Sequence, residues 1–465
     1  MHDITMESAF VPTGCEHSMR PQPAVTLGAG TIGFQAYDSV TTRNGKYVQG
    51  GGCLTVGLAG LVQGGGFGSF SKHYGSAAAS LLEAEVVTAD GTIRVANACQ
   101  SPDLFWALKG GGGGTFGVVS KLTLRLHELP HYFGIASLTV KASTNADYRR
   151  LLAEFVAFYR DSLFNDHWGE QAHLSPENTL EIRMLSYGLN ADQAKKVWQP
   201  FLDWVARSPH AFSFAGSTAI GSIPARHFWD VDWWKQHWPE VALPSPAGNP
   251  FVAFLEFGLT HLMPQPIFAF DRRPGASPGN AWWTANTRET GWYIWGYESV
   301  WLPSSLLEGG AQADLADALF ESSRYSVVEL HFNKGLAGAP PEAIAAARDT
   351  ATNPAVLSAF ALAISSGGES PAYPGIPGHE PSIADGRASA VQIHHCMNRL
   401  RAVAGQTGSY VSESNYFEKG WQRSYWASNY PRLAAMKRRY DPSGLFFVHN
   451  GVGSEEWSTD GFTRR

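Results

Sequence analysis

The chain of 465 residues is low in charge and has no long apolar run. Charged residues make up 16% of it, and 35 Lys and Arg against 41 Asp and Glu leave a net charge of −6. An acidic chain without a basic run lacks the electrostatic footprint of a nucleic-acid-binding protein. No stretch reaches the roughly 18 consecutive apolar residues of a membrane span. We therefore expect neither a nucleic-acid partner nor a membrane partner.

The first 20 residues lack the basic start and apolar core of a secretory signal. If Met1 is the genuine start, this pattern predicts a cytoplasmic protein.

Cysteine is scarce as well. The four cysteines, Cys15, Cys53, Cys99 and Cys396, lie far apart in the sequence. No Cys-x-x-Cys and no Cys/His pair has the spacing of a zinc site, so we expect no metal ion. The run His394-His395-Cys396 lies in a helical pattern without further ligands, and we interpret it as structural. A disulfide framework is not expected in a chain of this length.

Tryptophan and glycine are abundant. Nine of the 16 tryptophans fall between Trp229 and Trp301. This cluster fits either an aromatic core or an aromatic-lined ligand pocket, and both interpretations stay open. The stretch GGGCLTVGLAGLVQGGGFG, residues 50–68, places Cys53 between two glycine clusters. Because glycine weakens regular structure, such a run predicts a backbone that a bulky partner approaches closely.

The hydrophobic pattern predicts alternating sheet and helix segments. Asp90-Gly91 in the alternating stretch 81–96 predicts a β-hairpin. Strands are expected at 24–30, at the end of 103–130, between the helices 148–163 and 191–206, and at 325–335. Further helices are expected at 313–323, 341–350, 386–404 and 426–442, the last ending at Asp441-Pro442. Residues 366–388 have the composition of a loop.

Two nucleotide-binding motifs are incomplete. GAGTIG, residues 28–33, matches G-x-G-x-x-G, but no acidic residue follows at the distance that a Rossmann site requires. KGGGGGTFG, residues 109–117, places its lysine before the glycines and lacks the GK[ST] of a Walker motif. This run still presents several backbone N–H groups to a flat cofactor or a pyrophosphate, or else it is a flexible loop.

Four segments, taken in order, resemble one family. GGCLTVGLAGLVQGGGFGSFSKHYG, EAEVVTADG, DLFWALKGGGGGTFGVV and NYPRLAAMKRRYDPSGLF are similar to segments of berberine-bridge-enzyme-like FAD-linked oxidases of the vanillyl-alcohol-oxidase, PCMH-type superfamily. The resemblance covers about 24–130 and 405–455. It implies an α+β fold with an FAD-binding domain from 1–130 and 405–465. It also implies a substrate domain from 131–404, an antiparallel sheet backed by helices.

The resemblance implies FAD as cofactor, with Cys53 as a possible covalent tether to the flavin ring. The alternative for Cys53 is an inert buried thiol. The positions that match flavin-contacting segments of the family are Gly52, Cys53, Thr55, Val56, Gly57, Gly64, Gly65, Gly66, Gly68, Tyr74, Gly75, Gly117 and Val119.

Four residues are candidates for acid–base catalysis. Tyr410 matches the tyrosine of the family's Tyr-x-Asn motif, although Ser412 replaces the asparagine, and Tyr416 is the second candidate. An ordinary tyrosine has a pKa near 10, so a role as base needs a shift or a partner. Glu329 and His331 lie two residues apart on one face of a predicted strand and are the acidic and imidazole candidates.

The implied activity is FAD-dependent oxidation of a small organic substrate, a sugar or an aromatic or secondary alcohol. Hydride would pass to flavin N5 and then to O2 as acceptor, giving H2O2. A flavin dehydrogenase that does not use O2 is one alternative. The other is a degenerate, non-catalytic binding protein, because Phe67 replaces a common tyrosine and the chain begins after the family's N-terminal FAD subdomain.

Overall fold

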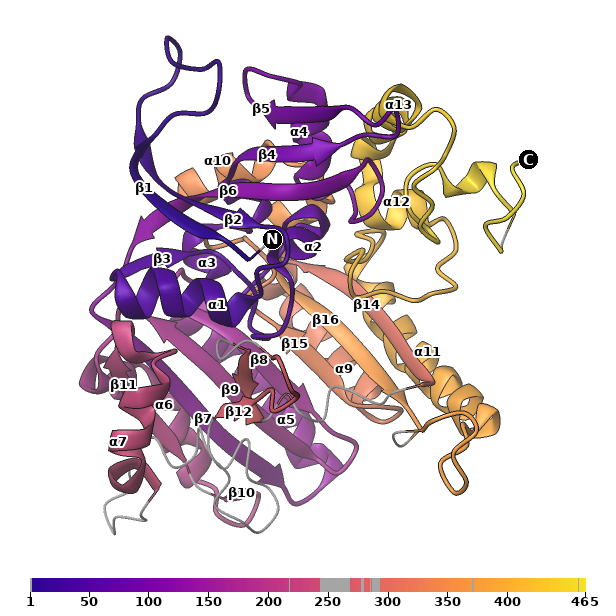
Figure 1. Ribbon diagram of the computed structural model, residues 1–465. Coiled ribbons are helices and arrows are strands. Elements are labelled where there is room, and N and C mark those ends of the chain that lie inside the picture. Colours follow the sequence, from indigo (N-terminus) through magenta and orange to yellow (C-terminus); the bar gives the residue numbers. More distant parts are fainter. Residues whose placement is uncertain are drawn as a thin grey trace.

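The computed structural model describes residues 2–216, 218–242, 268–276, 280–284, 286, 293–369, 372–458 and 460–465. Two large antiparallel sheets form its framework, one above the other in Figure 1. No helix in these ranges is both long and apolar enough to cross a membrane.

The first sheet has the strand order β1-β2-β6-β4-β5, with β3 paired to one end of β6. Its strands are β1 (Ile4–Phe10), β2 (Gln22–Gly28), β3 (Lys46–Val48), β4 (Leu81–Val87), β5 (Ile93–Asn97) and β6 (Val118–Glu128). The expected hairpin is confirmed: β4 and β5 pair antiparallel, and Gly91 between them has φ +74°. That left-handed conformation is the one that glycine adopts without steric cost.

Short helices from both ends of the chain cover this sheet. They are α1 (Gly33–Tyr37), α2 (Leu58–Gly64), α3 (Ser71–Tyr74), α4 (Pro102–Leu108), α12 (Trp421–Trp426) and α13 (Tyr430–Tyr440). The C-terminal helices, yellow in Figure 1, lie beside α4, and the guanidinium of Arg432 sits 3.9 Å from the ring centre of Trp106. The segment after residue 405 thus returns to the first sheet.

The second sheet has the strand order β10-β7-β9-β8-β15-β16-β14, with β11 also paired to β7. Its strands are β7 (Tyr132–Ala142), β8 (Trp168–Leu174), β9 (Thr179–Tyr187), β10 (Phe212–Phe214), β11 (Ala219–Pro224), β14 (Trp295–Pro303), β15 (Val328–His331) and β16 (Ala359–Gly368). One face is apolar, and the long helices α5 (Asn145–Phe158), α6 (Ala191–Ala206), α9 (Ala311–Ser323) and α11 (Ile383–Ala404) pack into a buried core there. An antiparallel sheet backed by helices is the expected α+β arrangement.

The remaining α-helices and β-strands of the described ranges are α7 (Val231–Ala242), α10 (Pro341–Arg348), β12 (Phe268–Phe270) and β13 (Ala281–Trp283). The proposed division at residue 130 does not separate the cores, because Phe133, Phe228 and Trp229 pack into the core of the first sheet.

Three tryptophans of the 229–301 cluster are core residues. Trp229, Trp234 and Trp301 are buried, and Trp229 stacks on Tyr37 with ring centres 4.0 Å apart. These three favour the interpretation of an aromatic core. Trp292 and the side chain of Trp238 lie outside the described residues.

The cysteine prediction was wrong for one pair, since Cys15 and Cys99 form a disulfide across 84 residues of sequence. The bond joins the β1–β2 connection to the segment after β5. Spacing did not reveal it, because the sheet brings together two loops that are remote in the sequence. Cys396 is buried in the second core, and burial raises the pKa of its thiol to about 12. Its neighbour His394 contacts the Glu298 carboxylate at 3.3 Å.

Candidate active site

An exposed surface beside Cys53 consists largely of glycine backbone, and we call it the bare surface. Gly52, Thr55, Val56 and Gly57 are exposed, and Cys53 among them is half-buried. A Cβ added at Gly57 or at Gly60 would meet no heavy atom of the described residues within 4 Å. Gly113 of the second glycine run lies alongside, since its added Cβ would be 3.9 Å from the Gly60 carbonyl oxygen. Two remote segments thus form one surface in which Gly57, Gly60 and Gly113 present backbone without side chains.

This surface fits a flat cofactor laid against the backbone. A side chain at Gly57 or Gly60 would project into the open space above it, and one at Gly113 would contact the Gly60 backbone. The residues present therefore fit FAD.

The other predicted glycines serve the packing of the chain on itself. A Cβ at Gly64 would lie 2.5 Å from Ser412 Oγ, at Gly66 2.7 Å from Ala77 Cβ, and at Gly68 2.2 Å from the Gly50 carbonyl oxygen. Gly65 has φ +115°, which disfavours any residue with a Cβ. These glycines hold the segment against its neighbours, and their contact with a cofactor stays a prediction.

GAGTIG has the same kind of structural role. The N–H of Gly33 donates to the Val56 carbonyl at 3.0 Å, and that of Phe34 donates to the Leu54 carbonyl at 2.9 Å. A Cβ at Gly33 would come within 3.5 Å of the Cys53 carbonyl oxygen. The motif therefore supports the Cys53 segment by close backbone packing.

A pocket of about 440 Å³ adjoins the bare surface. Its wall combines the two glycine segments with three C-terminal segments, and includes Gly60, Gly64, Gly112, Gly113, Val411, Ser412, Asn415, Tyr416, Trp426, His449 and Asn450. The ring of Tyr416 stacks on His449 with centres 3.9 Å apart, and the residue is 61% exposed. Tyr416 therefore lies at an open wall of this pocket.

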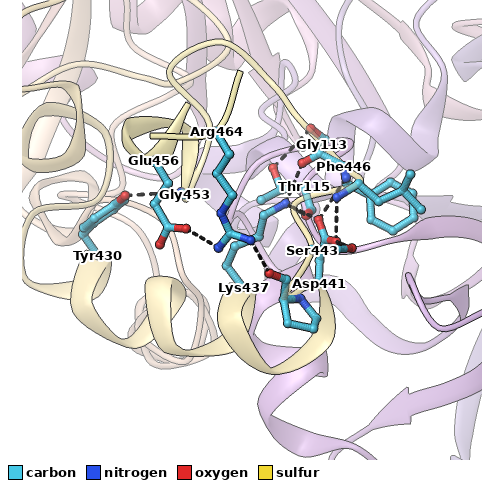
Figure 2. A network of polar contacts seen from close by, with 12 residues as sticks. Gly113, Thr115, Tyr430, Lys437, Asp441, Ser443, Phe446, Gly453, Glu456 and Arg464 are labelled. Carbon is cyan, nitrogen blue, oxygen red and sulfur yellow. Dashed lines mark hydrogen bonds and ion pairs between the residues drawn. The ribbon is translucent and has the colours of Figure 1, made fainter. Parts of the chain in front are cut away.

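The C-terminal segments fix the second glycine run. Figure 2 shows Lys437, whose Nζ donates to the Thr115 carbonyl at 2.8 Å and to the Asp441 carboxylate at 2.6 Å. Arg464 donates to the Pro442 carbonyl at 2.8 Å, next to Asp441, and to the Glu456 carboxylate at 2.6 Å. The indole N–H of Trp426 donates to the Gly110 carbonyl at 3.0 Å. The run is therefore a fixed surface and not a flexible loop.

Tyr410 is buried next to the first glycine segment. Its hydroxyl oxygen accepts a hydrogen bond from the Gly66 N–H at 3.2 Å. Its ring centre lies 5.2 Å from that of Phe67 and 6.2 Å from that of Trp301. Burial raises the pKa of Tyr410 to about 12. This shift is opposite to the one that a base needs, so the hydroxyl keeps its proton and is suited to donate it in a hydrogen bond.

Glu329 and His331 lie on the polar face of the second sheet. His331 Nε2 and Glu329 Oε2 are 3.2 Å apart, and burial lowers the pKa of His331 to about 3. Between β15 and β16, Glu329 pairs with Ile364 and His331 pairs with Leu362. The side chains of Ile364 and Leu362 cluster with Tyr410. The opposed residues of an antiparallel pair share a face, so Glu329 and His331 face the Tyr410 side.

The remaining predicted residues lie in packed surroundings. The Tyr74 hydroxyl donates to the Glu128 carbonyl at 2.8 Å, and Val119 pairs with Val86 inside the first sheet. A Cβ at Gly117 would lie 2.6 Å from the Val87 carbonyl oxygen, and one at Gly75 3.6 Å from that of Ala343. Their assignment to the cofactor stays a prediction.

Three charged residues of this region were missed. Glu170 in β8 lies beside the bare surface, with Oε1 3.7 Å from a Cβ added at Gly52. Lys334, just after β15, forms an ion pair with Glu413, just after Tyr410. No local pattern marks these residues, because only the packing of the two sheets brings them together. Within the described residues no group of three or more His, Cys, Asp and Glu side chains could hold a metal ion.

Two protein families match parts of the chain: "FAD binding domain" over residues 17–97 and "Berberine and berberine like" over residues 409–453. The VAO-type flavoprotein oxidase VAO615 of Thermothelomyces thermophilus is 30% identical over 441 residues, 94% of this chain and 65% of that protein. The FAD-linked oxidoreductase easE of Arthroderma benhamiae is 30% identical over 449 residues, 94% of this chain and 76% of that protein. The chain thus spans about 65% of the length of the first curated relatives it matches.

Solved structures share the fold. The crystal structure of the VAO-type flavoprotein MtVAO615 from Myceliophthora thermophila matches with a TM-score of 0.69 at 25% identity, over 98% of this chain and 71% of that chain. A carbohydrate oxidase from Microdochium nivale matches with a TM-score of 0.62 at 18% identity, over 92% of this chain and 78% of that chain, which is a likeness of fold alone.

Proposed function

The chain belongs to the VAO-type, berberine-like family of FAD-linked oxidoreductases, and from this premise we propose that it binds FAD and oxidises a small organic substrate carrying a hydroxyl group. FAD bound at this site would accept a hydride at N5 and pass the electrons to O2, which gives H2O2. The substrate classes proposed are sugars and aromatic or other secondary alcohols.

One observation carries the proposal: the bare backbone surface next to a half-buried cysteine. Gly57, Gly60 and Gly113 would hold the cofactor by backbone contact. Cys53 would tether it, since it lies in the exposed segment of the same surface. Lys437 and Trp426 would keep the second glycine run rigid under it.

The polar groups of the site fit a hydroxylated substrate. The Tyr410 oxygen already accepts from Gly66, which leaves its O–H proton to donate to a substrate oxygen. His173 and Gln171 on β8 are joined at 2.9 Å and oppose Glu329 and His331 across the ladder. This wall of hydrogen-bonding side chains supports recognition of hydroxyl groups.

The test is a substrate panel run on the purified chain supplied with FAD. Oxygen consumption and peroxide release are measured with sugars and with aromatic and secondary alcohols, and reduction of an artificial dye is measured in parallel. Peroxide with at least one class supports the oxidase. Dye reduction without oxygen consumption would replace it by the dehydrogenase. FAD binding with no turnover of any kind would replace it by a non-catalytic binding protein.

A further inference from the structure

We propose that Glu170 is a further catalytic residue of this site, the group that takes the hydroxyl proton from the substrate as it is oxidised. The proposal rests on the function proposed above and identifies a residue that neither the family match nor the sequence singled out.

Glu170 lies where the two sheets meet beside the bare surface. Glu170 is half-buried, and its carboxylate Oε1 would lie 3.7 Å from a Cβ added at Gly52, the residue before Cys53. The preceding Gly169 packs directly on the connection between α2 and α3, because a Cβ there would lie 2.2 Å from the Ser69 carbonyl oxygen. Gly52 and Gly169 thus remove the side chains that would separate Glu170 from the Cys53 segment.

The backbone of Glu170 is strained. Its φ is +70° inside strand β8, a left-handed conformation that costs free energy in any residue with a Cβ. The strand holds it there, since the Glu170 carbonyl accepts from the Phe332 N–H at 2.8 Å and Gly169 and Gln171 keep their places opposite β9. Such strain gathers at functional sites, where it aims a side chain that a regular strand would turn elsewhere.

The surroundings of Glu170 suit a proton acceptor. Burial raises the pKa of its carboxyl above the ordinary value, while a hydrogen bond from Ser69 and the charge of Lys334 oppose the rise. The other groups facing it are Glu413, which is paired with Lys334, and the phenols of Tyr37 and Tyr47. A carboxyl whose pKa is raised holds a proton better than an exposed one and still releases it to solvent.

The other candidates are less suited to this role. The Tyr410 hydroxyl, with a pKa raised to about 12, is protonated at neutral pH. His331, with a pKa lowered to about 3, is neutral there and binds a proton too weakly. Glu170 therefore complements Tyr410, which holds the substrate oxygen while Glu170 takes its proton.

The step balances with the oxidant already proposed. The O–H bond of the substrate breaks, and its proton goes to the Glu170 carboxylate. The C–H bond on the carbon that carries this hydroxyl group breaks, and its hydrogen leaves with both electrons as hydride to the bound flavin. The O–H electron pair closes the C=O bond, and Glu170 later returns the proton to solvent.

The experiment compares Glu170→Gln and Glu170→Asp with the wild type and with Glu177→Gln, a carboxyl removed from the exposed turn between β8 and β9. In the wild type we expect kcat to rise with pH as the Glu170 carboxylate forms. E170Q should lose this acid limb and about 10²–10⁴-fold of kcat. E170D should keep the limb with a smaller loss, because aspartate tolerates a positive φ and only shortens the reach. E177Q should match the wild type.

A second measurement does not depend on turnover. The carboxyl carbon of Glu170 is followed by NMR in ¹³C-glutamate-labelled protein without substrate, and E170Q assigns the signal. We expect its titration midpoint above the value of about 4.3 for a free glutamate side chain.

An ordinary midpoint, or an E170Q enzyme with the wild-type rate and pH profile, would overturn the proposal. If E170Q does not fold, E170D decides, because a wild-type rate together with an unshifted acid limb in E170D would overturn the proposal. If the wild type oxidises no substrate but Glu170 titrates high, the function has failed and Glu170 is a buried acid without a catalytic role.

Discussion

The hydroxyl of Tyr410 accepts a hydrogen bond from the backbone N–H of Gly66 at 3.2 Å, across 344 residues of sequence. This contact joins the C-terminal segment to the first glycine segment. It also orients the phenol, because the oxygen that accepts from Gly66 keeps its own proton for a second partner.

Replacing Tyr410 by Phe removes this hydroxyl and leaves the ring packed between Phe67 and Trp301. One hydrogen bond lost to the substrate is worth roughly 1–3 kcal/mol. We therefore expect kcat/KM to fall by about 10–100-fold with unchanged FAD content. Steady-state kinetics of Y410F and Y416F are compared, and a larger loss in Y416F, whose side chain is exposed, would contradict the assignment.

The glycine surface predicts two opposite kinds of glycine variant. Gly60→Ala adds a methyl group in open space inside α2, so the apo-protein should be as stable or gain up to about 1 kcal/mol from helix propensity, while FAD binds more weakly. Gly68→Ala places a Cβ 2.2 Å from the Gly50 carbonyl oxygen and should lower the free energy of unfolding by several kcal/mol. Urea unfolding and FAD titration separate the two effects. Equal FAD affinity of G60A and the wild type would count against this surface as the cofactor site.

Lys72 predicts a pH-dependent stability. Its Nζ is buried and donates to the carbonyls of Gly335 at 2.5 Å, Ala337 at 2.9 Å and Phe360 at 3.1 Å, which joins α3 to the second sheet. Burial lowers the pKa of Lys72 to about 7, below the value of about 10.4 in the unfolded chain. Between these values the unfolded chain binds more protons, so stability from this group rises with pH, by up to about 1.4 kcal/mol per unit.

The variant Lys72→Met should flatten this rise. It should also lower the free energy of unfolding at pH 7 by about 2–4 kcal/mol, because three buried carbonyls lose their donor. Chemical denaturation is followed from pH 6.5 to 9.5, with Lys121→Met, whose side chain is exposed on the face of β6, as control. Identical pH slopes for K72M and the wild type would show that Lys72 does not titrate in this range.

The Cys15–Cys99 disulfide predicts sensitivity to reductant. In the chain-entropy account a bond across 84 residues stabilises by about 4–5 kcal/mol. Cys15→Ser, Cys99→Ser and the double variant should all lose this amount, since each removes the same bond. Thermal unfolding with and without dithiothreitol measures it. A wild type indifferent to reductant, or a double variant clearly weaker than either single, would refute the estimate.

Local signals in the sequence were sufficient for much of the fold. The helix expected at 191–206 is α6 with the same bounds, because Asn190 and Gln193 form a capping box and the apolar face repeats with helical spacing. The last helix, α13, ends at Tyr440, just before Asp441-Pro442, as the proline predicts. The hairpin between β4 and β5 also follows from a local signal, the turn-forming pair Asp90-Gly91.

Contacts between segments that are remote in the sequence could not be predicted from such local signals. The Cys15–Cys99 bond, the Lys72 carbonyl contacts and the position of Glu170 each join segments that are remote in the chain. Most glycines of 64–68 allow other atoms of the protein to pack closely against them, whereas Gly57 and Gly60 face open space. Composition alone does not distinguish these cases, since both follow from where other segments pack.

The most direct test of the central claim is the absorbance spectrum of the purified chain, incubated with FAD, freed of unbound FAD by gel filtration and then precipitated with acid. We predict a yellow pellet from the wild type and from the matched control Cys396→Ala, and a colourless pellet with yellow supernatant from Cys53→Ala. Yellow supernatant from all three would leave FAD binding in place and remove the tether. Wild-type protein that stays colourless after incubation with FAD would contradict the account.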